Sequence, residues 1–211
     1  RFTSDAAHEL RSPLAALKVQ TDVAQLSQDD PQAREKALAQ LHAGIDRASR
    51  LVDQLLTLSR LDSLDNLDDV DPITLADLLQ SAVLDIWHPA QQAGIDIRLF
   101  NHAPQVKRQG QPLLLSLLVR NLLDNAIRYS PRGSVVDVTL DARSFSVRDN
   151  GPGVDPEVLA RIGERFYRPP GQNATGSGLG LSIVRRIAAL HGMHVSLSNA
   201  AEGGFEVKVS W

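Results

Sequence analysis

Several features that mark common classes of protein are missing from this chain of 211 residues. It contains no cysteine, which excludes a disulfide framework and thiolate metal ligands. No apolar run approaches the ~20 residues that a membrane-spanning helix needs, so we expect the chain not to span a membrane. With 22 Lys+Arg against 25 Asp+Glu the net charge is −3, and there is no long basic run. Nucleic acid is therefore not expected as a partner.

What is present is typical of a globular protein: 43% of the residues are hydrophobic and 22% are charged. This length allows one large or two small domains. Because the chain begins at Arg1 rather than at a methionine, we expect it to be a piece of a longer protein.

The first third of the chain has a helical pattern. Apolar side chains recur at three-four spacing over residues 10–24 and again over 38–55, which predicts two long helices. Asp30 and Pro31 are typical of an N-cap and a first helical position. Each apolar stripe needs more partners than one neighbouring helix offers, so we predict a homodimer that packs as a four-helix bundle.

Residues 62–72 hold five aspartates and no basic residue, so we predict a linker at 63–72, although an acidic helix end is also compatible. Beyond it, Thr74 and Asp77 resemble a capping box that opens a helix over 74–92, with Gly94 as its stop. Further helices are predicted over 113–129, from 155 and over 178–191. Strands are predicted over 95–100, 105–109, 135–140, 145–148, 195–197 and 205–209. This order indicates an α+β sandwich with a mostly antiparallel mixed sheet and helices on one face.

His8 is followed at once by Glu9 on the first predicted helix. Near neutral pH much of a histidine population carries a free lone pair that can attack phosphorus. Glu9 could accept a hydrogen bond from the other ring nitrogen and so fix the tautomer. We predict that His8 is a nucleophile, although the pair alone is also compatible with a solvated surface.

Asn121 and Asn125 lie four residues apart on a predicted helix and therefore share one face. Their carboxamide oxygens are hard, neutral ligands of the kind that suits Mg²⁺, which takes its other ligands from phosphates and water. The pair predicts a magnesium nucleotide site, and a solvated helix surface is the alternative.

Two glycine-rich stretches strengthen the nucleotide hypothesis. Residues 149–153 read D-N-G-P-G directly after a strand, where glycines allow close approach and Asp149 could accept a hydrogen bond from the amine of adenine. A turn with an incidental carboxylate is the alternative. Residues 176–181 read G-S-G-L-G-L and open a helix, whose N-terminal N–H groups attract phosphates. They match neither a Walker A loop nor a dinucleotide fingerprint.

In this order the motifs resemble those of bacterial two-component sensor histidine kinases, over essentially the whole chain. Residues 8–13 resemble the family's phospho-acceptor box, 121–131 its N box and 149–153 its first glycine box, while 164–168 resemble its F box and 176–181 its second glycine box. The resemblance implies a dimerisation and phospho-acceptor domain at 1–62, the linker at 63–72 and a catalytic ATP-binding domain at 73–211. The second domain would have the sandwich fold of gyrase, Hsp90, histidine kinases and MutL.

The resemblance also implies roles. His8, assisted by Glu9, would take the γ-phosphoryl group of ATP and pass it to an aspartate of a response regulator. Asn125 would bind Mg²⁺ and Asp149 would recognise adenine. The other nucleotide-binding residues would be Asn121, Arg128, Tyr129, Gly151, Gly153, Phe166, Gly176, Gly178, Leu179 and Gly180. The full-length protein would lie at the bacterial inner membrane with this part on the cytoplasmic face.

One departure from the family pattern and one difference from related ATPases bear on the activity. Ser12 stands where many relatives carry a threonine linked to dephosphorylation of the regulator, so that activity stays open. Asn121 stands where gyrase-type ATPases carry a glutamate that activates water, which favours transfer to histidine over hydrolysis. A gyrase-like ATPase and a non-enzymatic docking module with a degenerate nucleotide site are the competing hypotheses.

Overall fold

The computed structural model describes residues 2–27, 29–169, 176–201 and 203–211. The chain forms two compact units, Arg1–Arg60 and Leu61–Trp211, and each is described by itself. Within the described ranges, no helix combines the length and the apolarity that crossing a bilayer requires.

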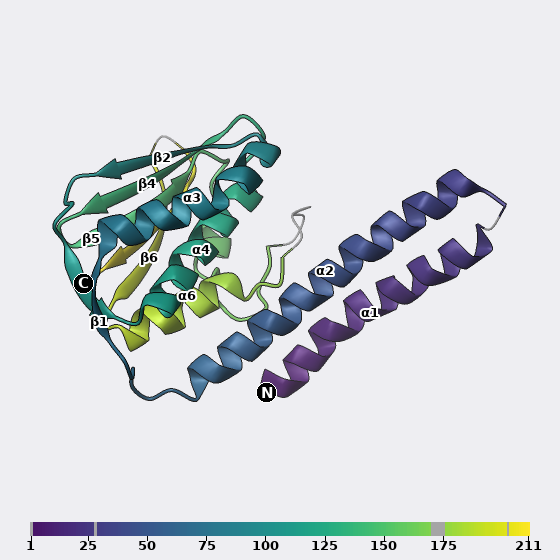
Figure 1. Cartoon of the computed structure of the whole chain (residues 1–211), viewed down its shortest axis with the longest axis horizontal. Helices are drawn as coiled ribbons and strands as arrows, with labels where there is room; N and C mark the ends of the chain where they lie inside the picture. Colours follow the sequence, from purple (N-terminus) through teal and green to yellow (C-terminus); the bar gives the residue numbers. More distant parts are fainter. Residues whose placement is uncertain (1, 28, 170–175, 202) are drawn as a thin grey trace. The chain divides into compact units, whose positions relative to one another are not determined.

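The first unit is a hairpin of two long helices, α1 (Phe2–Leu26) and α2, which begins at Pro31 and ends at Asp62 (Figure 1). Pro13 does not end α1. The predicted cap of α2 is confirmed, because Asp30 Oδ1 accepts hydrogen bonds from the N–H groups of Gln32, at 3.1 Å, and Ala33, at 3.0 Å. Two of the N–H groups that have no partner inside the helix are thereby satisfied.

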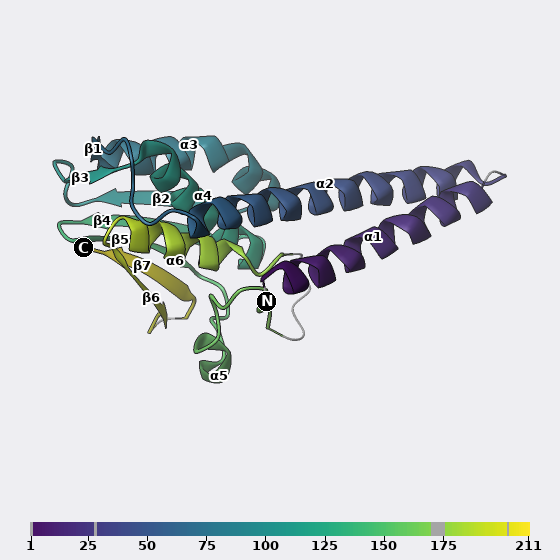
Figure 2. The ribbon, with the colours of Figure 1, turned by 90° about the horizontal axis from the view of Figure 1, so that it is seen from below.

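The second unit is a sheet covered on one face by helices, as predicted. The helices on that face are α3 (Leu75–Ala93), α4 (Pro112–Tyr129) and α6 (Gly180–Leu190) (Figure 2). The strands are β2 (Asp96–Asn101), β4 (Val135–Asp141), β5 (Ser144–Asp149), β6 (His194–Asn199) and β7 (Phe205–Ser210). They form a five-stranded sheet in the order β2-β4-β5-β7-β6, in which only the β2–β4 pair is parallel. A short helix, α5 (Pro156–Leu159), follows β5.

The core of this unit lies between the sheet and the helices. Alternate residues of β4, namely Val136, Val138 and Leu140, are fully buried, as the period of a strand requires. The central helix α4 packs against both α3 and α6. α4, which carries Asn121 and Asn125, is therefore held against α6, which begins at the second glycine motif.

One strand was not predicted. β1 (Asp71–Thr74) pairs antiparallel with β3 (Lys107–Gly110), so the last two residues of the predicted linker belong to a strand. Thr74 is the N-cap of α3, so the predicted start of this helix is confirmed, but its side chain makes no capping hydrogen bond and the predicted capping box does not form. The predicted stop is confirmed, since Gly94 has a left-handed φ of 70°.

The first residues of the second unit are fixed to α6. Arg186 donates hydrogen bonds to the carbonyl oxygens of Leu61, at 3.1 Å, and Leu64, at 2.5 Å. Asp62 forms an ion pair with Arg165 at 2.8 Å. The start of the acidic segment is thus tied to the helix that opens at the second glycine motif.

Candidate nucleotide site and phospho-acceptor histidine

The two asparagines of α4 face the first residue of α6. Asn121 is 8% exposed and its Nδ2 donates a hydrogen bond to the Leu117 carbonyl at 2.8 Å, which leaves Oδ1 on the other side of the carboxamide. A Cβ atom placed on Gly180 would lie 3.3 Å from Asn121 Oδ1 and 3.4 Å from both amide heteroatoms of Asn125. A side chain at 180 would therefore crowd the space in front of both carboxamides. The structure brings the N box and the second glycine box together.

The last turn of α4 faces a second glycine. A Cβ on Gly176 would lie 3.1 Å from Arg128 Nη1 and 3.3 Å from the Tyr129 hydroxyl. A guanidinium and a phenol therefore line the approach to α6, whose N-terminus carries partial positive charge. This combination suits an anionic group such as a phosphate.

Asp149 ends β5 and is 5% exposed. Its Oδ1 accepts hydrogen bonds from the N–H groups of Gly151, at 2.9 Å, and Phe205, at 3.1 Å. Burial raises the pKa of this carboxyl above its ordinary value, while the two N–H groups and the charge of Arg148 act in the opposite direction. No hydrogen bond to Oδ2 exists among the described residues. Oδ2 is therefore the oxygen able to accept a hydrogen bond from a ligand.

The glycines beside Asp149 keep the backbone close to it. A Cβ on Gly151 would lie 2.9 Å from Asp149 Oδ1, and Gly153 has a φ of +74°, which side chains rarely adopt. Gly204, at the β6–β7 turn, would collide with the Asp149 carbonyl oxygen if it carried a Cβ. Backbone therefore lies close to Asp149 on these sides, and a side chain at Gly151 or Gly204 would collide with Asp149.

The F box and the second glycine box are joined directly. Phe166 has a φ of +64° and its N–H donates a hydrogen bond to the Gly178 carbonyl at 3.1 Å. A Cβ on Gly178 would lie 2.7 Å from the Phe166 carbonyl carbon. Leu179 follows with 0% exposure, anchoring the start of α6 in the core. Residues 170–175, between these two motifs, lie outside the described residues.

His8 lies on α1 with an exposed side chain, and Ser12 is exposed one turn later on the same face. Glu9 is half-buried. In the described part of the chain neither His8 nor Glu9 makes a side-chain hydrogen bond, and adjacent helical residues point about 100° apart. The hydrogen bond between the two side chains stays a prediction.

Comparisons with known proteins agree with this geometry. Residues 110–211 match the family described as histidine kinase-, DNA gyrase B-, and HSP90-like ATPase, and residues 1–64 match the His Kinase A (phospho-acceptor) domain. The chain belongs to the sensor histidine kinases. Sensor protein QseC of Salmonella typhimurium is 81% identical over 211 residues, which are 100% of this kinase chain and 47% of the relative. The chain therefore spans about half the length of these curated relatives.

Two solved kinase structures carry the comparison further. The cytoplasmic segment of histidine kinase QseC is 64% identical, with a TM-score of 0.59, over 79% of this chain and 93% of that one. Histidine kinase ThkA, solved in complex with response regulator protein TrrA, has a TM-score of 0.79 over 99% of this chain and 60% of that one. At 20% identity the second likeness shows the fold alone. The predicted fold class is confirmed.

Sequence reasoning missed the contribution of the β6–β7 hairpin to this kinase's site. Phe205 supplies an N–H to Asp149, and Asn199 forms hydrogen bonds with the backbone of Val154, next to Gly153. The stretch 199–205 contains two glycines, which indicated only a turn. No local pattern pairs it with a motif about 50 residues earlier.

Proposed function

We propose that this chain is the kinase core that uses ATP to phosphorylate His8 and then passes the phosphoryl group to an aspartate of a response regulator. The observation that carries the proposal is the buried Asp149, which has one oxygen held by two backbone N–H groups and the other without a hydrogen bond among the described residues. A buried carboxylate needs such donors. The exocyclic amine of adenine is a donor of the right kind.

The adenine end of the site would work by close fit. Asp149 Oδ2 would accept a hydrogen from the amine, while Gly151 and Gly153 let the base approach the backbone. A Cβ on Gly151 would already lie 3.4 Å from the Tyr129 carbonyl, so the cradle has no room for a side chain there. Specificity for adenine would follow from a buried acceptor that is left without a partner when the amine is missing.

The phosphate end would work by charge and position, as phosphoryl transfer generally requires. Arg128 would neutralise phosphate charge, and Asn121 with Gly180 would hold the chain of phosphates against the start of α6. The carboxamide oxygen of Asn125 fits Mg²⁺, which would bridge phosphate oxygens and offset their charge when bound. Phe166, Gly176, Gly178 and Leu179 would shape the segment that covers the nucleotide.

In the transfer itself, a ring nitrogen of His8 would attack the γ-phosphorus. A nitrogen–phosphorus bond forms as the bond from the γ-phosphorus to the bridging oxygen breaks, and ADP leaves with the electron pair. Glu9 would accept a hydrogen bond from the other ring N–H, which stabilises the positive charge that develops on the imidazole. The exposure of His8 supports access by both ATP and the regulator.

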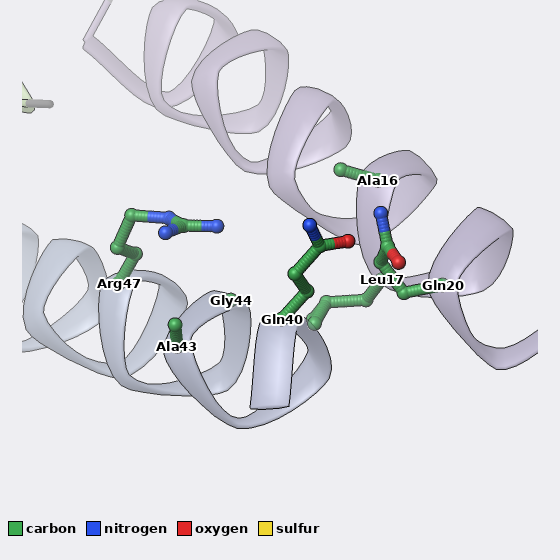
Figure 3. A pocket seen from close by; sticks show the side chains of 7 residues that line it. All are labelled: Ala16, Leu17, Gln20, Gln40, Ala43, Gly44 and Arg47. Carbon is green, nitrogen blue, oxygen red and sulfur yellow. The ribbon is translucent and has the colours of Figure 1, made fainter. Parts of the chain in front are cut away.

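A homodimer is part of the proposal. Apolar side chains of the hairpin are exposed, including Leu14 at 58% and Ile45 at 45%. A pocket of about 290 Å³ opens between α1 and α2, where Leu17 packs over Gly44 and the side chains of Gln40 and Arg47 line the wall (Figure 3). A second hairpin would cover these surfaces in a four-helix bundle. Ile45→Lys should therefore yield monomers in light scattering, whereas Ala39→Lys, off the apolar stripe, should stay dimeric.

The full-length protein would lie at the inner membrane with this part in the cytoplasm, and Ser12 would support dephosphorylation of the regulator. The solved complex of kinase ThkA with a response regulator protein supports the expectation of such a partner. The exposed hydroxyl of Ser12, one turn from His8, is in reach of a regulator that engages His8.

The test is autophosphorylation with γ-labelled ATP and Mg²⁺. We expect acid-labile label on the parent chain, none on His8→Gln, and full label on His42→Gln, a matched control because His42 is also an exposed hairpin histidine. Label that survives His8→Gln would contradict the role of His8. Steady phosphate release without labelled protein would instead favour the gyrase-like ATPase.

A further inference from the structure

The side chain of Asn199, the last residue of β6, forms hydrogen bonds with both the N–H and the carbonyl of Val154. Its Oδ1 accepts a hydrogen bond from the Val154 N–H at 2.8 Å, and its Nδ2 donates one to the Val154 carbonyl at 2.6 Å. The two backbone groups fix the orientation of the carboxamide, since one needs an acceptor and the other a donor. Among side chains of this size, only asparagine offers both at once.

Val154 is the residue at which the chain leaves the first glycine box, and we call this position the exit of the loop. It follows Gly153 directly and precedes Asp155, whose Oδ1 accepts a hydrogen bond from the Glu157 N–H at 2.8 Å and so caps α5. The entrance of the loop at Asp149 is already held by the ladder of β5. Asn199 therefore fixes the opposite end of the segment 149–153.

The same hairpin also reaches the carboxylate. Asn199 and Phe205 are directly opposite each other in the β6–β7 ladder. Phe205 donates its N–H to Asp149 Oδ1, while Asn199 holds Val154, so one strand pair contacts both ends of the loop. A Cβ on Gly153 would lie 3.0 Å from Asn199 Oδ1, which shows how closely the loop lies against this side chain.

We propose that Asn199 is a positioning residue for adenine recognition, which acts by holding the exit of the glycine loop and thereby the distance between the loop and Asp149. The inference rests on the proposed function, because it assumes that adenine binds at Asp149. In this proposal Asn199 acts through its hydrogen bonds to Val154 rather than by contact with the nucleotide. Its loss should weaken the adenine contact and leave the phosphate end of the site intact.

The experiment compares the binding of ATP with that of purine riboside triphosphate, which lacks the exocyclic amine, by calorimetry on the full chain. The parent should prefer ATP. Asn199→Ala should weaken ATP binding about tenfold, the equivalent of one hydrogen bond of about 1.4 kcal/mol, and should bind the analogue almost as the parent does. The KM for ATP in autophosphorylation should rise while kcat at saturating ATP is kept.

Two further variants sharpen the test. Asn199→Asp keeps the shape and the acceptor but places a carboxylate oxygen against the Val154 carbonyl, so it should not restore ATP binding. Asn101→Ala is the matched control: Asn101 also ends a strand and accepts a loop N–H, from Ala103 at 3.2 Å, but at the opposite edge of the sheet. It should bind both nucleotides like the parent.

The outcomes separate the two proposals. If the parent itself does not prefer ATP, the adenine contact of Asp149 fails and the proposed function with it. If the parent prefers ATP and Asn199→Ala keeps the full preference, or Asn199→Asp binds ATP like the parent, only the role of Asn199 is refuted. Loss of the fold in both variants, seen by circular dichroism, would also refute it, since the residue would then be purely structural.

Discussion

Replacing Asp149 by asparagine changes one carboxylate oxygen into an NH₂ group and leaves the shape of the side chain almost unchanged. The N–H groups of Gly151 and Phe205 both need the oxygen that faces them, so the amide oxygen of the variant should take the place of Oδ1. The NH₂ group would then occupy the place of Oδ2. There it would face the amine of adenine, and no hydrogen bond would form because both groups are donors.

The size of the effect follows from the hydrogen bond that is lost. A hydrogen bond to a charged group contributes about 1.5–3 kcal/mol. At about 1.4 kcal/mol for each factor of ten, Asp149→Asn should weaken ATP binding roughly 10- to 150-fold. Inosine triphosphate carries an acceptor oxygen where adenine carries its amine, so the NH₂ group can donate to it. The preference of the variant for ATP over inosine triphosphate should therefore fall sharply.

The stability of the variant should not fall with its affinity. Burial raises the pKa of Asp149 in the folded chain, so the folded state binds the proton more tightly than the unfolded state does. At a pH where the unfolded carboxyl is ionised, a raised pKa in the folded state lowers the free energy of unfolding, and asparagine removes this cost. We expect the denaturation midpoint to stay at or above that of the parent.

Calorimetric titration with both nucleotides, together with urea denaturation at pH 7, tests the reasoning. Weak ATP binding with an intact fold and a reduced preference for ATP is the expected result. ATP affinity within a factor of two of the parent would refute the adenine contact. A variant that is less stable by several kcal/mol would refute the reasoning from burial.

Two further predictions concern stability. His191 is buried, and burial lowers the pKa of its imidazole. Its Nδ1 lies 2.7 Å from the Ile187 carbonyl, and its Nε2 accepts a hydrogen bond from the Gln111 N–H at 3.1 Å. The folded state then binds the proton more weakly than the unfolded state does. Above about pH 6.5 this group therefore costs no stability, and below it the free energy of unfolding falls by up to about 1.4 kcal/mol per pH unit. His191→Gln should flatten this decline in urea titrations. Gly204→Ala should lower the free energy of unfolding by about 2 kcal/mol or more, because φ is +95° and the new Cβ meets backbone.

Each of these two stability predictions has a control measurement. For His191, the difference between parent and variant at pH 7.5 and pH 5.5 removes the contribution of the other histidines, and equal slopes would contradict the argument. For Gly204, the control is Gly133→Ala, at a φ of +85° with nothing within 4 Å of the new Cβ. Equal losses at the two glycines would mean that backbone strain, rather than the collision, sets the cost.

Local patterns carried much of the prediction. Asn121 and Asn125 share a helix face because four residues make about one turn. Gly180 is the first residue of α6, and Gly176 and Gly178 lie just before it, so the helix begins two residues later than predicted. Asp30 capped α2 as expected, because the cap involves neighbours in sequence. In each case the interaction spans only a few residues.

The failures involve contacts between distant parts of the chain. Thr74 is the N-cap of α3 as predicted, but it is also the last residue of β1, paired with Lys107, and its side chain makes no capping hydrogen bond. Asn199 and Val154 are 45 residues apart, and a single asparagine at a strand end has no pattern of its own. Pairings of this kind depend on the three-dimensional arrangement of the sheet, which local propensity does not determine.

The hydrogen bond from the Phe166 N–H to the Gly178 carbonyl has a consequence for chain length. It fixes the backbone positions of residues 166 and 178 relative to each other. The entropy of closing such a loop grows slowly, by about 0.6 kcal/mol for each doubling of its length. Loop-closure entropy by itself should therefore set only a small penalty on added residues between these two positions.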